Sequence, residues 1–230
     1  MEVPHIVLRD EWLAARKALL TEEKAFTRAR DALSAKRREM PWVKIDTSYV
    51  FDSPQGRQKL PDLFDGRSQL IVYHFMLGPD WEQGCKSCSF WADNFNDIIV
   101  HLNHRDVSMI AVSSAPIAKI EAFRKRMGWN FNWVSSGGTT FNQDFGVSPK
   151  MPGESVLYNY GAAKIDMDEL PGISVFARDE KGSVCHTYSC YSRGLDMLNG
   201  AYHYLDLVPK GRDEANLPGT MSWLKHHDRY

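Results

Sequence analysis

Two cysteines separated by two residues, Cys85 and Cys88, are the strongest chemical feature of the sequence. A thiolate can attack a disulfide, and a second thiol three positions along can then displace the product and close a disulfide within the chain. The same spacing also supplies two thiolate ligands for a metal ion. The pair therefore points either to thiol–disulfide exchange or to metal binding.

A structural zinc site needs four ligands, so a zinc interpretation requires a second pair with similar spacing. The other two cysteines, Cys185 and Cys190, lie five residues apart in a strand-like stretch and do not supply it. In a regular strand their side chains point to opposite faces, so we expect small buried core residues rather than a second redox centre. The sequence therefore favours thiol–disulfide exchange over a zinc site. A copper site with one distant imidazole stays open, with three candidate ligands: His74, His186 and His203.

The residues around the pair predict a strand, a loop and a helix, in that order. Residues 70–77 are almost continuously apolar, as expected for a strand buried on both faces of a sheet, and Gly78 and Pro79 end it. Apolar residues return at helical spacing over 89–95, which places both cysteines in the first turn of a helix. The partial positive charge of a helix N-terminus favours thiolate over thiol, and Lys86 adds a cation between the two sulfurs.

Further patterns place this unit in a layered domain. A buried strand at 107–113 is followed by an amphipathic helix at 117–127, so strands and helices alternate as they do around a parallel sheet. The pattern from 151 to 168 is weak. The remaining predicted elements are hairpins at 49–56 and 173–188, a short strand at Val134, and a closing helix at 194–205.

The N-terminal region predicts a long helix over residues 9–40, with Asp10 as its N-cap and Pro41 as its stop. About 29 helical residues would extend roughly 43 Å, more than the diameter of a small domain. We expect an arm that packs along its own domain, and a seam between two copies is the alternative. Large apolar residues recur every seven positions on one side: Trp12, Leu19, Phe26, Leu33 and Met40.

The composition is that of an ordinary globular protein, with 43% hydrophobic and 25% charged residues among 230. With 28 basic and 29 acidic residues the net charge is −1, so no global field attracts the chain to nucleic acid or to a membrane surface. We expect no secretory leader and no spanning helix, because no apolar run reaches roughly 18 residues. A cytoplasmic location follows, where cysteines serve chemistry more often than a disulfide framework.

Several longer segments resemble the thioredoxin superfamily, in particular its alkyl hydroperoxide reductase and thiol-specific antioxidant branch. From about Val43 to Tyr191 the resemblance is carried by LPDLFDGRSQLIVYHF, VSMIAVSSAPIAKIEAFRKRMG and FNQDFGV. The whole chain is more closely similar to an uncharacterised bacterial family of predicted dithiol–disulfide oxidoreductases, through strings such as EWLAARKALL, IVYHFMLGPDWEQGC, CSFWADNFN and GAYHYLDLVPKGRDE. This resemblance implies a thioredoxin-like fold, but a fold does not fix a function.

Carried over to this sequence, the resemblance makes Cys85 the attacking thiol and Cys88 the resolving thiol. Thioredoxins place a cis-proline just before their third core strand, and Pro171 is the nearest match here. The tryptophan that immediately precedes the first cysteine of thioredoxin is missing, since Trp81 stands four positions before Cys85. The resemblance therefore implies a longer loop and a different environment for the disulfide.

A peroxiredoxin would carry a proline and a threonine or serine seven and three positions before its peroxidatic cysteine. From Cys85 these positions hold Gly78 and Glu82, and from Cys88 they hold Trp81 and Cys85. Neither set fits the pattern. A peroxide reductase is therefore the weaker enzyme hypothesis.

A carboxylate near the pair could accept the proton of the resolving thiol. Asp93, five residues past Cys88 on the predicted helix, is the first candidate for this role. We predict an α/β protein with a thioredoxin-like, three-layer α/β/α fold and a mixed central sheet. Its predicted parts are an N-terminal helical arm at 1–41, the thioredoxin-like domain at 42–205, and a C-terminal tail packed on that domain at 206–230.

The favoured function is thiol–disulfide exchange by Cys85 and Cys88 without a cofactor. The expected partners are a protein or small-molecule thiol or disulfide, and a reductant such as thioredoxin or glutathione. A homodimer through the N-terminal helix is a further expectation. The alternatives are a thiol-dependent peroxidase, and a non-enzymatic copper- or zinc-binding protein of thioredoxin fold.

Overall fold

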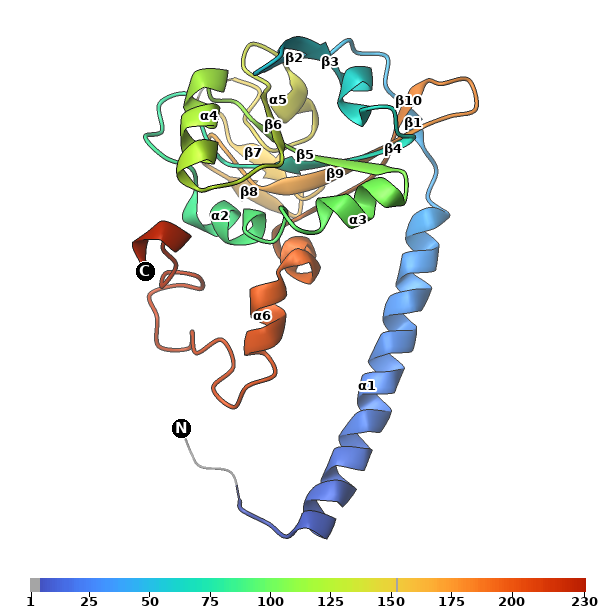
Figure 1. Cartoon of the computed structure of the whole chain (residues 1–230), viewed down its shortest axis with the longest axis vertical. Helices are drawn as coiled ribbons and strands as arrows, with labels where there is room; N and C mark the ends of the chain where they lie inside the picture. Colours follow the sequence, from blue (N-terminus) through green and yellow to red (C-terminus); the bar gives the residue numbers. More distant parts are fainter. Residues whose placement is uncertain (1–4, 152) are drawn as a thin grey trace. The chain divides into compact units, whose positions relative to one another are not determined.

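The computed structural model describes residues 5–151 and 153–230. It divides into two compact units, residues 1–41 and 42–230, which are described separately. Helix α1 (Arg9–Arg38), drawn in blue in Figure 1, makes up most of the first unit and confirms the predicted long helix. The predicted N-cap is wrong, because Leu8 holds the N-cap position. Asp10 lies in the first turn, where its negative charge interacts favourably with the helix dipole.

The apolar stripe of α1 has no apolar partner within its own unit. None of the described residues of this helix is buried, and Phe26 is 70% exposed. A single helix has no second surface against which such side chains could pack. The stripe is therefore uncovered by the described residues of the first unit.

The second unit is built on an eight-stranded sheet in the order β1-β10-β9-β4-β5-β6-β2-β3 (Figure 1). Its centre consists of β4 (Gln69–His74), β5 (Val107–Ser113) and β6 (Asn132–Ser135), which run parallel to one another. β9 (Gly172–Arg178) pairs antiparallel with β4, and β10 (Val184–Tyr191) pairs antiparallel with β9. The predicted strands at 107–113 and Val134 and the predicted hairpin at 173–188 are confirmed. The predicted strand at 70–77 is also present, but it ends at His74, so residues 75–77 already belong to the loop.

Short strands complete the sheet at its edges. β1 (Val43–Lys44) pairs with β10, and the hairpin of β2 (Val50–Ser53) and β3 (Gly56–Lys59) joins through β6. The stretch whose pattern was weak contains a separate two-stranded sheet of β7 (Val156–Tyr158) and β8 (Ala163–Ile165).

Helices cover both faces of the large sheet. One face packs against α2 (Lys86–Ala92), α3 (Ile99–His104) and α4 (Ile117–Arg126), with Trp91 and Phe123 in its core. The other face packs against the 3₁₀ helix Leu60–Phe64 and α5 (Phe141–Asp144). Alternate residues of β5 enter the two cores, which explains why this strand is apolar throughout.

The arrangement of β5, β4, β9 and β10, with only β9 reversed, together with helices on both faces, defines a thioredoxin-like three-layer α/β/α fold with a mixed sheet. The predicted fold class is confirmed, including the N-terminal helix. The part of the chain that the structure describes contains no helix long and apolar enough to cross a membrane.

The predicted closing helix at 194–205 is interrupted. A 3₁₀ helix covers Ser192–Leu198, Asn199 is extended, and α6 then spans Gly200–Leu205. The Asn199 side chain accepts a hydrogen bond from the Tyr202 backbone N–H at 3.1 Å, so it caps a new helix instead of continuing the first. Beyond α6 the chain includes the 3₁₀ helix His227–Arg229. The boundary at residue 205 stays a prediction.

The prediction that Cys185 and Cys190 point to opposite faces is wrong. The register pairs Cys185 with Ala177 and Cys190 with Ile173, which are four positions apart on β9 and so share a face. A β-bulge between His186 and Tyr188 inserts one extra residue and restores the parity. Both cysteines are buried, as expected.

Candidate active site

The Cys85–Cys88 pair lies where the central strand gives way to α2. The backbone N–H of Cys85 donates to the carbonyl oxygen of Met76 at 3.0 Å, which folds the loop back onto the end of β4. Leu77 is held to the next strand, since its carbonyl accepts from Ala115 N–H at 2.9 Å. Cys85 is the N-cap residue of α2 and Cys88 lies in its first turn, as the sequence predicts.

The two thiols have different surroundings. Cys88 is 1% exposed, and its sulfur accepts a hydrogen bond from the Met76 backbone N–H at 3.5 Å. Cys85 is partly exposed. All four cysteines, which lie within the described residues, are thiols rather than disulfides.

The electrostatics of the pair are also unequal. A hydrogen bond from the Cys88 thiol and the backbone N–H groups of Ser87 and Cys88 lower the pKa of Cys85 to about 6, against the opposing effect of burial. Burial first, and the neighbouring Cys85 second, raise the pKa of Cys88 well above the usual value. At neutral pH the pair therefore consists of one thiolate and one thiol.

Two of the predicted supporting residues lie close to the pair. Lys86 is exposed on the first turn of α2, but the main stabilisation of the Cys85 thiolate comes from Cys88 and the backbone instead. The Trp81 ring packs over Gly78, where an added Cβ would lie 3.0 Å from it. This contact closes the turn that leads to the thiols.

Asp93 does not lie near the thiols. It caps the opposite end of α2, about 10 Å along the helix axis from its start. Its carboxylate accepts hydrogen bonds from Trp129 Nε1 at 2.9 Å and from His227 Nδ1 at 2.6 Å. The predicted role of Asp93 as a proton acceptor for Cys88 is therefore wrong, and its contacts are structural.

Pro171 borders the same cavity as Cys88, as the resemblance implied, but the peptide bonds of the described residues are all trans. The predicted cis-proline is a trans proline that precedes β9. Its carbonyl oxygen accepts a hydrogen bond from the Tyr158 hydroxyl.

The histidines proposed as copper ligands do not gather around the thiols. His74 is buried on the opposite face of β4, where its Nε2 lies 2.8 Å from Ser174 Oγ, and burial lowers its pKa to about 3. His186 Nε2 lies 2.7 Å from Ser189 Oγ, and His203 is exposed on α6. Across residues 5–151 and 153–230, no three His, Cys, Asp or Glu side chains lie close enough together to hold a metal ion.

Three groups at the site were missed by the sequence analysis. Tyr73, on β4, places its hydroxyl in the core beside Cys88. Glu169 is buried near Pro171 and accepts a hydrogen bond from Ser114, and burial raises its pKa to about 7. His226 contacts the residue before Cys85. Glu169 and His226 come from distant segments, so no local spacing could have indicated them, whereas Tyr73 lies within the predicted central strand itself.

The fold and the unequal thiol pair define a thioredoxin-like protein with a Cys-x-x-Cys pair at a helix N-terminus. The chain belongs to a bacterial family described as proteins of unknown function, DUF899, whose model matches residues 1–230. No curated protein is similar enough in sequence to match it.

Among solved structures, peroxidoxin BcpB from Mycobacterium tuberculosis is similar over 69% of this chain and 92% of its own, with 15% identity and a TM-score of 0.48. Peroxiredoxin Q from Xanthomonas campestris is similar over 70% of this chain and 95% of its own, with 13% identity and a TM-score of 0.49. Similarity at this level carries no information about the reaction of this chain.

Proposed function

We propose that this protein is a thiol–disulfide oxidoreductase in which Cys85 attacks a disulfide and Cys88 closes the cycle. The observation that supports this most strongly is the inequality of the two thiols at the start of α2. A thiolate at neutral pH, with a lowered pKa of about 6, stands beside a buried thiol whose pKa is raised. A two-step exchange requires a nucleophile and a protected resolving group in this order.

In the first step the Cys85 thiolate attacks one sulfur of the substrate disulfide, forms a mixed disulfide and releases the other sulfur as a thiolate. Cys88 then loses its proton and attacks the Cys85 sulfur, which releases the second half of the substrate as a thiol. The protein is oxidised to a disulfide and the substrate is reduced to two thiols. These steps use no cofactor.

A thiol donor such as thioredoxin or glutathione would return the protein to the dithiol state. A cytoplasmic location suits this cycle, because the reducing pool there keeps both thiols available. The physiological substrate is either a protein or a small-molecule disulfide.

The test is the reduction of insulin and of glutathione disulfide by wild-type protein, Cys85→Ser, Cys88→Ser and the control Cys185→Ser. We expect Cys85→Ser to lose turnover and Cys88→Ser to accumulate a mixed disulfide that mass spectrometry detects. The control should retain full activity, since Cys185 lies on β10 away from the pair. Full activity in both pair variants would overturn the proposal.

The exposed stripe of α1 supports a second element of the proposal, assembly through this helix into a homodimer. Apolar side chains spaced by seven residues form a seam that a second copy could cover. Phe26→Glu should then shift the sedimentation coefficient to that of a monomer, whereas Lys24→Gln, an exposed residue on the opposite side of the helix, should not. A monomeric wild-type protein would contradict the dimer.

A further inference from the structure

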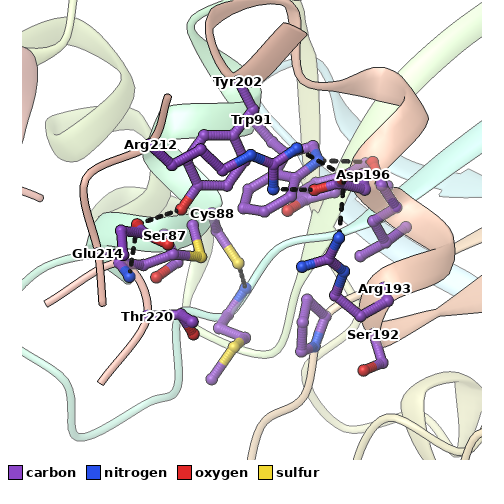
Figure 2. A pocket seen from close by; sticks show the side chains of 15 residues that line it. Ser87, Cys88, Trp91, Ser192, Arg193, Asp196, Tyr202, Arg212, Glu214 and Thr220 are labelled. Atoms are coloured by element: carbon purple, nitrogen blue, oxygen red, sulfur yellow. Dashed lines mark hydrogen bonds and ion pairs between the residues drawn. The ribbon is translucent and has the colours of Figure 1, made fainter. Parts of the chain in front are cut away.

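A cavity of about 230 Å³ lies beside Cys88 at the start of α2. Figure 2 shows Ser87 and Cys88 among the residues that form its wall. An engineered apolar cavity of about 150 Å³ in another protein is large enough to bind benzene. The space beside Cys88 therefore suits a small molecule of one or two rings, or a short alkyl group, and is too small for a folded partner or a long peptide.

The wall of this cavity is mainly apolar. Its apolar side chains include Met76, Trp91, Pro171, Leu195 and Met221. Ligand sites of this kind bind through apolar contact, with a few polar groups that fix the orientation of the ligand. The lining thus favours an apolar ligand.

The charged side chains that border the cavity cancel one another. The Arg212 guanidinium lies 2.9 Å from Asp196 and stacks 3.9 Å from the centre of the Tyr202 ring. Arg193 lies 3.4 Å from the same Asp196. Arg193 is largely exposed. The less exposed Arg212 is engaged by both Asp196 and Asp206, at 2.9 and 2.7 Å, and so gives a ligand no unpaired charge to bind.

The remaining carboxylate at the cavity, Glu214, is engaged through one of its two oxygens. Its Oε1 accepts hydrogen bonds from the Tyr202 hydroxyl and Trp223 Nε1, both at 2.7 Å, and from Met221 N–H at 2.9 Å. Two cations and two carboxylates therefore balance around the cavity (Figure 2). A neutral ligand fits these surroundings better than an ion does.

One polar group at the cavity is not satisfied. The Tyr73 hydroxyl is buried and has no hydrogen-bond partner of regular geometry within the described residues. Burial is the largest cause of the raised pKa of this phenol, and the Cys88 sulfur beside it, as a charge and as a weak hydrogen-bond partner, is the next. A buried hydroxyl that lines a cavity beside the resolving thiol, Cys88, and makes only a weak contact with it is available to donate a hydrogen bond to a ligand.

We propose that this cavity binds the neutral aryl or alkyl group of a small organic disulfide and so holds its sulfur–sulfur bond at the thiol pair, with the Tyr73 hydroxyl donating a hydrogen bond to the bound group. The inference rests on the proposed function and names its substrate class. The bonds formed and broken are those of the two-step exchange described above, so the disulfide leaves as two neutral organic thiols.

Binding can be measured without any reaction. Bipyridine has two neutral rings, nitrogen atoms that accept hydrogen bonds, and no sulfur–sulfur bond, so its affinity by titration calorimetry reports on the cavity alone. We expect wild-type protein to bind it. Thr220→Trp, at the exposed rim of the cavity, should weaken binding at least about tenfold, which corresponds to about 1.4 kcal/mol.

The matched control is Ser222→Trp, which adds the same ring two residues away on an exposed side chain outside the cavity wall. It should bind bipyridine as the wild type does. Tyr73→Phe removes only the hydroxyl and should weaken binding about threefold to tenfold. Failure of the wild type to bind bipyridine, or an affinity equal to that of the wild type in both Thr220→Trp and Tyr73→Phe, would overturn the inference.

Activity then separates this inference from the function on which it rests. The protein's rates of reduction of dipyridyl disulfide and of hydroxyethyl disulfide are each divided by the rate at which free dithiothreitol reduces the same disulfide. The ratio removes the difference in intrinsic reactivity between the two substrates. The wild type should prefer the aromatic disulfide and Thr220→Trp should lose that preference, whereas Ser222→Trp, outside the cavity wall, should keep both rates. Reduction of both disulfides without bipyridine binding would overturn the cavity assignment alone. Bipyridine binding with no faster reduction than Cys85→Ser would overturn the proposed function and, with it, the disulfide substrate.

Discussion

His226 Nε2 lies 2.8 Å from the carbonyl oxygen of Gly84, the residue that immediately precedes Cys85. The imidazole is buried, and its burial lowers its pKa, so the neutral ring donates its Nε2–H to this carbonyl. Two residues after His226, Asp228 forms an ion pair at 2.9 Å with Arg126 of α4. The C-terminal segment therefore holds the loop from which the attacking thiol projects.

His226→Ala should destabilise this loop. The buried Gly84 carbonyl would lose its donor, which costs about 1–3 kcal/mol in free energy of unfolding. Chemical denaturation measures this loss, and hydrogen exchange over residues 78–84 should become faster. Lys225→Ala is the control, because Lys225 is exposed and only its backbone N–H makes a contact in this segment. Equal stability of the two variants would contradict the role of His226 in holding the loop before Cys85.

Cys85 should react with iodoacetamide in a pH-dependent way, with a midpoint near its pKa of about 6. The thiolate is present above this pH and is lost as the pH falls through it. Cys88→Ala should move the midpoint upward, since the hydrogen bond from the Cys88 thiol is the largest contribution to the low pKa. Cys185→Ala should leave it unchanged. An unshifted midpoint in Cys88→Ala would show that the helix N-terminus alone activates the sulfur.

Glu169 should make the protein less stable as the pH rises. Burial raises its pKa from the ordinary 4.5 to about 7, so the folded state holds a proton that the unfolded state has lost between these values. The free energy of unfolding should fall by about 3 kcal/mol across this window, at 1.36 kcal/mol per pH unit. In Glu169→Gln this component should disappear, while in Asp168→Asn it should persist in slightly reduced form, because the charge of this exposed neighbour is the smallest of the causes that shift the Glu169 pKa. A pH dependence identical to wild type in Glu169→Gln would refute the assignment.

Hydrogen peroxide should oxidise Cys85 no faster than it oxidises an ordinary thiolate of the same pKa. The positions that hold proline and threonine or serine in a peroxiredoxin are Gly78 and Glu82 here, so the groups that would orient a peroxide are missing. Stopped-flow measurement of sulfenate formation, with Cys85→Ser as the blank, checks this. A rate far above that of the free thiolate would favour the peroxidase alternative.

Local pattern was enough to predict most of the sheet. The strand at 107–113 is a continuous apolar run because its residues enter the cores on both faces of the sheet. The hairpin at 173–188 is marked by a turn that contains Asp and Gly residues. Both patterns are visible in the sequence. The thiol pair at the start of α2 was predictable for the same reason, because strand, turn and helix are consecutive. The break at Asn199 was not, since it depends on a side chain that competes for one backbone N–H.

The rest of the site depends on contacts between segments far apart in the sequence. His226 meets Gly84 across 142 positions, and the cavity joins β4 to residues beyond 192. Asp93 was misplaced because the helix was expected to turn it towards the thiols, whereas α2 is long enough to carry it to the other end. The bulge in β10 likewise changed the faces of Cys185 and Cys190 without a sequence pattern to mark it.

The enclosure of Cys88 between α2 and β4 has a practical consequence for labelling. A bulky maleimide can approach the partly exposed Cys85, whereas the three other sulfurs are buried in the native protein. A dye or spin label could therefore be attached at one defined point without replacing any cysteine. The label would then report on the surroundings of the N-terminus of α2 in the unmutated protein.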